Sequence, residues 1–213
     1  MKVAIFQFQL FGINTYVVYD QTTHKCAVID PGMLGEEEEE AMSEFLKRNN
    51  LTLTNVINTH LHIDHAVGNR YLRDKFKAPV LAHRDDEPLG SRMQQQAIMF
   101  GINNNFDELI IDKYLEDGDI IKIGNGELEV IAVPGHSLGS IALYDKADNF
   151  VIVGDALFQG SIGRTDLPGG NYNQLINSIK SRLFSLPDNT VVYPGHGNPT
   201  TIGAEKRSNP FLK

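Results

Sequence analysis

Short apolar runs separated by turn residues dominate this chain, and the pattern predicts many short strands. Residues 3–10 and 14–20 flank a turn and are expected to pair, and residues 26–30 add a third strand. Asn125-Gly126 lies between two later runs and predicts a tight hairpin. Further apolar runs of strand length occupy residues 55–58, 79–82, 128–133, 150–154 and 191–193.

Three stretches have the periodicity of helices. Residues 36–48 begin with a run of glutamates and end at Lys47-Arg48, a charge order that favours the helix dipole, so the acidic run is interpreted as a solvated first turn and not as a cation site. Residues 66–76 and 173–186 place apolar side chains at helical spacing and are expected to pack on the sheet.

The segment from Arg84 to Asn105 is polar and poorly periodic, and it predicts no clear element. Met93, Ile98, Met99 and Phe100 could line a substrate cleft. Core packing is the favoured interpretation, because methionine and aromatic side chains readily fill gaps in a core.

Composition narrows the class of protein. The 213 residues are 41% hydrophobic and 22% charged, without a linker or repeat, which predicts one globular domain spanning residues 1–213. The net charge of −8 disfavours nucleic acid as a partner. There is no apolar run of bilayer length and no leader-like start, so we expect a cytoplasmic protein without a membrane partner. The sole cysteine, Cys26, is interpreted as a packed strand residue, and the sequence does not predict an oligomeric state.

The loop from Thr59 to His65 carries the densest chemistry of the chain. It follows a predicted strand and precedes a predicted helix, and it holds three histidines and one aspartate. In an extended backbone His60 and His62 point to the same side, whereas on a helix they would lie roughly 200° apart. Asp64 and His65 follow the turn and can point to a second position. The spacing therefore suggests two adjacent metal ions.

Three more candidate ligands stand where other predicted strands end. His136 and His196 each follow an apolar run and a Pro-Gly turn, and Asp155 directly follows residues 150–154. Strand ends are where distant parts of a sequence bring functional groups together. Nitrogen and oxygen donors without thiolate suit zinc, iron or manganese. His24 and His83 lie outside this pattern and are interpreted as surface or loop residues.

The pattern His-x-His-x-Asp-His at residues 60–65, followed by the isolated His136, Asp155 and His196, resembles the metallo-β-lactamase-fold hydrolase superfamily. Gly-Asp-Ala-Leu-Phe at 154–158, Gly-Arg-Thr-Asp at 163–166 and Pro-Gly-His-Gly at 194–197 resemble glyoxalase II and its short, single-domain relatives. The resemblance covers nearly the whole chain. It implies an α+β fold, a four-layer αββα sandwich with a dinuclear metal site at one edge.

The resemblance also implies roles for individual residues. The seven implied ligands are His60, His62 and His136 for the first metal, Asp64, His65 and His196 for the second, and Asp155 as a bridge. Zinc is the expected metal, with iron or manganese as alternatives. Asp64 would also orient a metal-bound hydroxide, which would attack a small thioester of the S-lactoylglutathione type. Asp30 is either a turn cap or a partner of the histidine loop.

Substrate recognition is where the chain departs from glyoxalase II. Full-length members carry a helical C-terminal domain that helps to hold glutathione, whereas this chain ends soon after His196. Arg164 matches a basic residue that contacts the glutathione carboxylate, and we predict that it binds an anionic part of the substrate. The alternative is that Arg164 holds its own loop through Asp166. Asp166 and Asn198 replace tyrosines found in some members.

Three other functions stay open for such a site. Persulfide dioxygenases of the same superfamily hold one iron, which here would bind His60, His136 and Asp155, and they share the Gly-Arg-Thr-Asp stretch. Hydrolysis of a lactone or another ester is also possible. True β-lactamases usually lack the bridging aspartate, so Asp155 counts against antibiotic hydrolysis. The complete ligand set argues against an electron-transfer or signalling module that merely keeps the fold.

Overall fold

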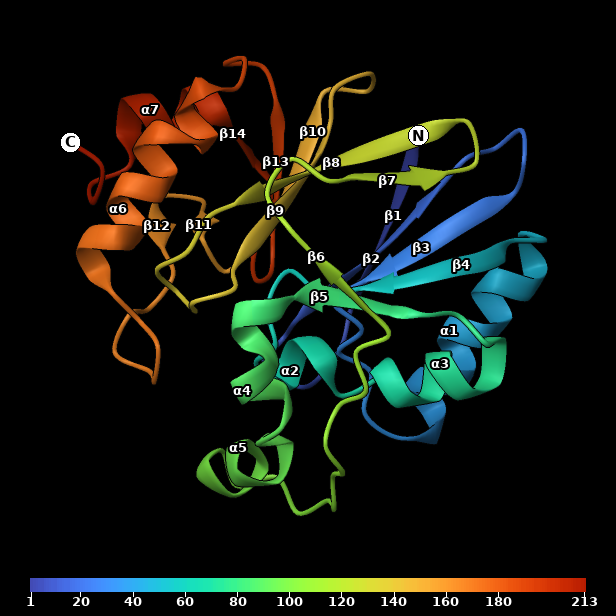
Figure 1. Ribbon diagram of the computed structural model, residues 1–213. Coiled ribbons are helices and arrows are strands. Elements are labelled where there is room, and N and C mark those ends of the chain that lie inside the picture. Colours follow the sequence, from blue (N-terminus) through green and yellow to red (C-terminus); the bar gives the residue numbers. More distant parts are fainter.

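The computed structural model describes residues 1–213 as two six-stranded sheets with helices on their outer faces (Figure 1). In spatial order the first sheet contains β1 (Lys2–Gln7), β2 (Asn14–Tyr19), β3 (Lys25–Ile29), β4 (Thr52–Ile57), β5 (Val80–His83) and β6 (Lys113–Leu115). The second contains β14 (Thr200–Thr201), β13 (Val191–Pro194), β10 (Phe150–Gly154), β9 (Ile141–Asp145), β8 (Gly126–Ala132) and β7 (Ile120–Ile123). A small hairpin pairs β11 (Leu157–Phe158) with β12 (Ser161–Ile162).

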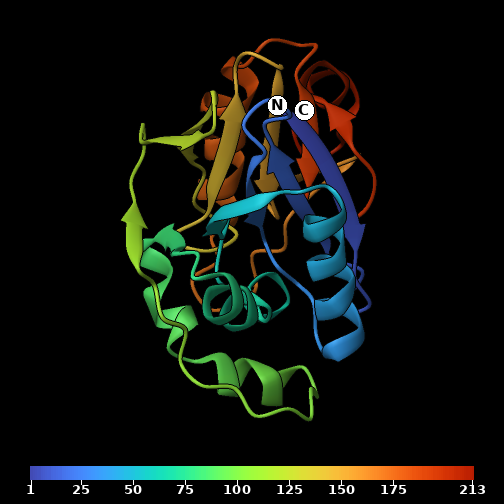
Figure 2. The same cartoon turned by 90° about the vertical axis from the view of Figure 1, so that its right-hand side faces the viewer.

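The helices connect and cover these strands. They are α1 (Glu36–Arg48), α2 (Ile63–Ala66), α3 (Asn69–Phe76), α4 (Glu87–Gly90), α5 (Met93–Met99), α6 (Tyr172–Ser181) and α7 (Ile202–Ser208), with 3₁₀ turns at Arg84–Asp86 and Leu183–Ser185. Figure 1 shows α1 and α3 outside the first sheet, and α6 and α7 outside the second. Figure 2 shows α5, in green, at the end of the molecule where it contacts α2. No helix has the length and apolar character that crossing a lipid bilayer requires.

Alternation along the strands builds the layers. In β10, Phe150 and Ile152 join the apolar cluster between the two sheets, whereas Val151 and Val153 pack toward Leu175 of α6. The first sheet divides its side chains in the same way, between the inner cluster and the helices α1 and α3. The predicted four-layer αββα sandwich is therefore confirmed.

The direction of the strands decides where the loops meet. β13 runs parallel to β10, and β8 and β10 are both antiparallel to β9, which lies between them. The carboxyl ends of β8, β10 and β13 therefore lie at one edge of the second sheet. The end of β4 is tied to the same edge, because the backbone N–H of Ile141 donates to the carbonyl of Thr59 over 2.9 Å.

Most predicted elements are confirmed, with some differences at their ends. The helix predicted at 66–76 is broken, since α2 ends at Ala66 and α3 begins at Asn69. α6 ends at Ser181, and α7 follows β14 although no helix was expected there. The hairpin between β7 and β8 turns at Gly124-Asn125, one residue before the predicted Asn125-Gly126, because Gly124 takes the left-handed φ of 62°.

Four apolar side chains of the poorly periodic segment have different surroundings. Met93 is buried in a small core cluster, as predicted. Core packing is wrong for Ile98 and Met99, which are 71% and 61% exposed, and Phe100 is only half-buried. The reason is that α5 contacts the body of the protein with one face only, at Met93, Gln96 and Ala97.

Candidate metal centre

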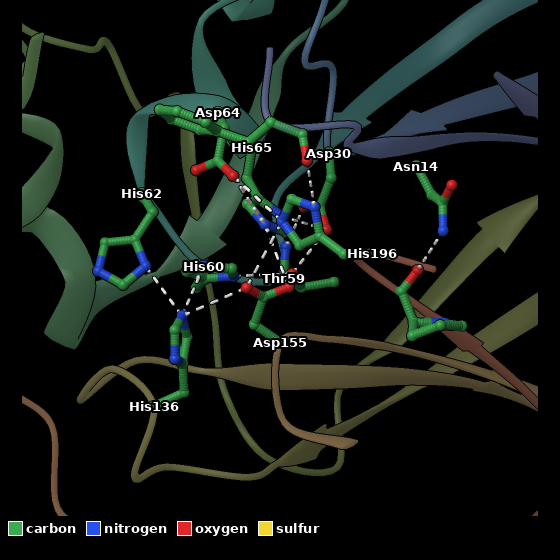
Figure 3. A network of polar contacts seen from close by, with 12 residues as sticks. Asn14, Asp30, Thr59, His60, His62, Asp64, His65, His136, Asp155 and His196 are labelled. Atoms are coloured by element: carbon green, nitrogen blue, oxygen red, sulfur yellow. Dashed lines mark hydrogen bonds and ion pairs between the residues drawn. The ribbon is translucent and has the colours of Figure 1, made fainter. Parts of the chain in front are cut away.

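Four strand ends deliver the predicted ligands to one place. The loop at residues 60–65 follows β4, while His136, Asp155 and His196 follow β8, β10 and β13. Figure 3 shows these side chains pointing toward a common centre from both sheets. The backbone at His62 is extended, with φ −67° and ψ 151°, as the prediction for the histidine pair requires. Both His24 and His83 lie outside the cluster. His24 is exposed, as expected for a surface residue, whereas His83 is half-buried at the end of β5.

Two residues near this edge have a left-handed backbone, and each has its own role. Gly154 has φ 51°, and a Cβ atom there would lie 2.2 Å from Oγ1 of Thr59, so only glycine fits. Asp30 also has φ 51°, a conformation that aspartate tolerates better than most residues. The turn at Asp30 directs its carboxylate under the histidine loop.

The first donor group consists of His60, His62 and His136. Nε2 of His136 lies 2.9 Å from Nδ1 of His62 and 3.2 Å from Nε2 of His60. The three rings are nearly perpendicular to one another, with centroids 4.7 Å apart. Three ring nitrogens that converge in this way offer three lone pairs to one cation.

The second donor group consists of Asp64, His65 and His196. Oδ2 of Asp64 lies 3.1 Å from Nε2 of His196 and 3.8 Å from Nε2 of His65. The group combines two imidazoles with a carboxylate, and His196 is its most exposed member. It can hold a second cation beside the first group.

Asp155 faces both donor groups. Its Oδ1 lies 3.3 Å from Nε2 of His65, and its Oδ2 lies 3.8 Å from Nε2 of His136 and 3.6 Å from Nε2 of His196. Nε2 of His65 and Oδ1 of Asp155 are buried and have no hydrogen-bond partner. Buried polar atoms without partners are rare and costly, and a bound cation between them would satisfy both.

A hydrogen bond on the far side of four rings fixes which nitrogen faces the centre. Nδ1–H of His136 donates to the carbonyl of Arg164 over 2.8 Å, and Nδ1–H of His196 donates to the carbonyl of Phe11 over 3.2 Å. Nδ1–H of His65 donates to Asp30 over 3.0 Å. Nδ1 of His60 contacts the Thr59 hydroxyl at 3.2 Å. Such bonds leave Nε2 as a free lone pair, which is the usual arrangement around a metal.

Asp30 is the shared acceptor beneath the histidine loop. Its carboxylate accepts from Thr59 N at 2.7 Å, Thr59 Oγ1 at 2.6 Å and His65 Nδ1 at 3.0 Å. Of the two interpretations of Asp30, the structure supports a partner of the histidine loop.

Electrostatics differ between the two groups. Burial, reinforced by the neighbouring imidazoles, holds the pKa of His60 well below its ordinary value and lowers the pKa of His62 to about 3. Burial alone would lower the pKa of His65 too, but the carboxylates of Asp64, Asp155 and Asp30 outweigh it and raise that pKa. For His196, burial is likewise outweighed, chiefly by the bond to Asp64, and the pKa is raised.

The carboxylates respond in the opposite sense. Burial would raise the pKa of Asp155 and of Asp64, but His65 and the other imidazoles outweigh it and lower both pKa values. Both carboxylates are therefore ionised at neutral pH, which is the form that binds a cation.

Two side chains that the sequence did not single out hold the histidine loop. Asp86 accepts hydrogen bonds from the backbone N–H of Leu61 and from the loop that follows His136. Gln96 of α5 accepts from Ile63 N at 3.0 Å and donates to the carbonyl of Leu61 at 3.1 Å. Both lie in the polar segment at 84–105, where nothing in the local pattern indicated a contact with the metal loop.

Arg164 lies close to the centre through its backbone, not through its side chain. Its carbonyl accepts from His136, while its guanidinium forms two 2.8 Å bonds to Asp166 and is 55% exposed. The geometry is that of the alternative interpretation, in which Arg164 holds its own loop. Binding of a substrate anion by Arg164 stays a prediction.

Comparison with known proteins decides the family. The sequence profile of the metallo-beta-lactamase superfamily matches residues 9–196, a range that contains all seven clustered donors. The chain belongs to the metallo-beta-lactamase superfamily. The clustered histidines and aspartates suit divalent metal ions, which are the ions that this superfamily binds.

Full-length relatives of this superfamily resemble the chain from end to end. Hydroxyacylglutathione hydrolase GloC from Haemophilus influenzae is 35% identical over 100% of this chain and 98% of its own length. The probable metallo-hydrolase YqgX from Bacillus subtilis is 36% identical, over 88% of this chain and 87% of its own. The chain is accordingly a metallo-hydrolase of the superfamily.

Solved structures extend the similarity to the fold. The crystal structure of the BLEG-1 B3 metallo-beta-lactamase superposes with a TM-score of 0.90 at 34% identity, with all of both chains covered. The crystal structure of TTHA1623 in a di-iron-bound form superposes with a TM-score of 0.86 at 35% identity, again over both whole chains.

Proposed function

We propose that this protein is a dinuclear-metal hydrolase that cleaves a small thioester of the S-lactoylglutathione type. The observation that carries the proposal is the pair of adjacent donor groups with Asp155 between them and two buried donor atoms left without partners. The full-length similarity to a hydroxyacylglutathione hydrolase supports the substrate class, and the di-iron form of TTHA1623 supports two ions.

The residues present fit two divalent cations. His60, His62 and His136 would hold one ion, and Asp64, His65 and His196 the other, with Asp155 shared between them. Bound ions supply a water molecule with a pKa lowered to about 7 and a Lewis acid for the substrate carbonyl. Zinc suits the nitrogen and oxygen donors, and so do iron and manganese.

The side chains of this chain then have separate tasks. Asp64 keeps one carboxylate oxygen close to His196, and its ionised form can accept a hydrogen bond from the attacking water and orient it. Asp30 and the carbonyls of Arg164 and Phe11 keep the imidazoles in fixed tautomers. Preorganised groups of this kind need not rearrange as charge develops on the carbonyl oxygen.

The composition of the cluster favours a leaving group that departs as an anion. The two donor groups and Asp155 consist only of histidines and aspartates, and both carboxylates, Asp64 and Asp155, are ionised. No lysine, tyrosine or protonated carboxyl among them can protonate a leaving group. A thiolate needs little such help, which supports thioesters over amides.

The test is to assay metal-loaded protein, prepared with zinc, iron or manganese in turn, against four substrates. These are S-lactoylglutathione, a lactone, a chromogenic cephalosporin and glutathione persulfide, the last with oxygen uptake as the readout. Hydrolysis of the thioester with a kcat/KM at least about 100-fold above the lactone and the cephalosporin is expected. A preference for the cephalosporin would overturn the proposal and assign the chain the activity that the name of BLEG-1 states.

The mononuclear alternative also has an observation in its favour. Nε2 of His136 lies 3.2 Å from Nε2 of His60 and 3.8 Å from Oδ2 of Asp155, so His136 has both of the other two donors close to it. Such a set suits one iron, as in a persulfide dioxygenase. Oxygen consumption with the persulfide, by protein that holds one iron per chain, would establish it.

A further inference from the structure

A cleft of about 310 Å³ opens beside the metal centre, on the side of His62. Its lining includes Met99 and Phe100, at the C-terminal end of helix α5, and Leu167-Pro168 of a loop. Its volume is at the lower end of the range for small-molecule sites, so it suits one arm of a substrate. Since His62 belongs to the first donor group, an arm in this cleft would leave the scissile carbonyl next to the centre.

One apolar side chain of the cleft, Met99, is not needed for folding. Met99 is 61% exposed, so it contributes little to the core. The half-buried ring of Phe100 is braced edge-to-face by Phe11, with centroids 5.5 Å apart. Phe11 lies in the loop between β1 and β2, whose carbonyl orients His196. The apolar wall is thereby fixed relative to the metal centre.

Arg92 supplies the only formal charge on the lining of this cleft when His62 is neutral. It is exposed and forms no ion pair, in contrast to Arg164, which Asp166 holds with two bonds. A guanidinium offers a planar fork that fits a carboxylate. In a chain of net charge −8, this unpaired cation gives an anionic substrate a local attraction.

We propose that this cleft binds a substrate arm with an apolar stem and a terminal carboxylate, which Arg92 holds. The inference rests on the proposed thioesterase function and names its substrate class: thioesters that carry a carboxylate a few methylene groups away from the scissile bond. The arm belongs to the acyl group or to the thiol, and the choice of substrates below separates the two.

The experiment compares four thioesters as two matched pairs. S-glutaryl- and S-butanoyl-N-acetylcysteamine differ by a carboxylate on the acyl arm, and S-acetyl-4-mercaptobutanoate and S-acetylpropanethiol differ by one on the thiol arm. For Arg92→Gln we expect KM to rise about 10-fold for the charged member of one pair, with kcat and the neutral member unchanged. Arg92→Lys should recover part of the loss. Arg48→Gln, an equal change of charge on α1, controls for the net charge.

Three outcomes would overturn the inference. Equal changes for charged and neutral members would make Arg92 structural. A selectivity that changes in Arg164→Gln and not in Arg92→Gln would place the anion site at Arg164.

If the protein hydrolyses no thioester, the proposed function fails, but calorimetry with glutarate and butanoate still tests whether the cleft binds a carboxylate. A preference for glutarate over butanoate that Arg92→Gln removes would then support it, and no preference would overturn it.

A second inference comes from Asp86, which is only 1% exposed. Its Oδ2 accepts from Leu61 N at 3.0 Å and from the Ser137 hydroxyl at 2.8 Å, and its Oδ1 accepts from Gly139 N at 2.7 Å. Leu61 lies between two ligands of the first donor group, and Ser137 follows the third. One buried carboxylate therefore joins the two loops that form this group, although the loops belong to different sheets.

We infer that Asp86 is a positioning residue for the first donor group. All three partners of Asp86 are hydrogen-bond donors. In Asp86→Asn the amide NH2 group would face one of these donors, so a hydrogen bond is lost and the two loops should move apart. With cobalt as the probe, we expect a 10- to 100-fold weaker affinity and an altered visible spectrum at the first group, with the second group retained. Asp145→Asn is the control, since Asp145 is also buried and accepts backbone N–H groups, but at the start of a distant turn. An unchanged cobalt spectrum in Asp86→Asn, or the same change in Asp145→Asn, would overturn the inference.

Discussion

The two donor groups of the metal centre lie side by side but are built from different chemistry. His60, His62 and His136 form a buried, all-imidazole group, in which burial and mutual proximity lower the pKa values of His60 and His62. The second group contains Asp64 and two imidazoles whose pKa values the surrounding carboxylates raise. His60 and His62 are therefore neutral before a metal binds, whereas the raised pKa values of His65 and His196 favour their protonated forms.

The difference shows how one fold can place two metal sites of different charge next to each other. The loop after β4 contributes ligands to both groups, and the distinction comes from what lies behind each ring. The rings of His60 and His62 face other imidazoles, while His65 has Asp30 behind it and Asp155 in front. We expect the two sites to differ in affinity and in pH dependence.

Replacing the shared ligand should have the largest effect. Asp155→Ala removes the only carboxylate that faces both groups, so we expect both metals to bind more weakly and kcat/KM to fall roughly 10³-fold or more. Elemental analysis after dialysis and steady-state kinetics measure the two effects. Loss of a single ion, with the other bound as in wild type, would show that Asp155 serves one group only.

Replacing one ligand in each group should separate the two sites. His62→Ala should lower the metal affinity of the first site, and His196→Ala that of the second, each by about 10- to 100-fold. The other site should keep its ion. Titration of metal-free protein with cobalt, followed by its visible spectrum, distinguishes the sites. Identical losses in both variants would mean that the donors act as one site.

A smaller and unequal effect is expected from the carboxylate beneath the loop. Asp30→Asn weakens the acceptor for Nδ1–H of His65 and leaves the rings of His62 and His136 untouched. The second site should lose about 10-fold in affinity and the first site less. Thermal unfolding of the metal-free variant serves as the control for general destabilisation. An equal loss at both sites would assign Asp30 to the loop as a whole.

Proton release on metal binding should give the most direct view of the electrostatics of the two groups. In the metal-free protein the raised pKa values keep His65 and His196 protonated below those values, so a metal must displace protons from the second group. Affinity there should rise with pH through neutrality, by about tenfold per pH unit for each proton released. The lowered pKa values of His60 and His62 predict that these two ligands of the first group contribute little pH dependence in the same range. Calorimetry in buffers of different ionisation enthalpy counts the protons, and equal release at both sites would contradict this picture.

The sequence predicted the donors because their signals are local. Asp155 directly follows its strand, and His136 and His196 each follow a strand within a few residues, after a Pro-Gly turn. The extended backbone at His62 was predicted from the two-residue spacing of His60 and His62. The individual strands and helices followed from the spacing of apolar side chains, whereas the four-layer arrangement was implied by the resemblance to the metallo-β-lactamase-fold superfamily. One turn was misplaced by a residue, because the φ of Gly124 could not be read from its neighbours.

What the sequence missed depends on contacts between distant segments. Asp86 holds Leu61 and Gly139, 25 and 53 residues away, and Gln96 reaches Leu61 across 35 residues. No periodicity encodes such partners. Met99 was assigned to the core because its type suits a core, whereas α5 buries only its opposite face. Asp86 and Gln96 thus contact the histidine loop, and Met99 lines the cleft, without a local signal in the sequence.

The most direct test of the account is the number of metal ions that each chain binds. Protein purified anaerobically and saturated with zinc, iron or manganese in turn is analysed for metal and protein content, with His196→Ala measured in parallel. Two adjacent donor groups predict close to two ions per chain in the wild type and close to one in His196→Ala. One ion per chain in the metal-replete wild type would contradict the dinuclear hydrolase and favour the mononuclear iron site of His60, His136 and Asp155.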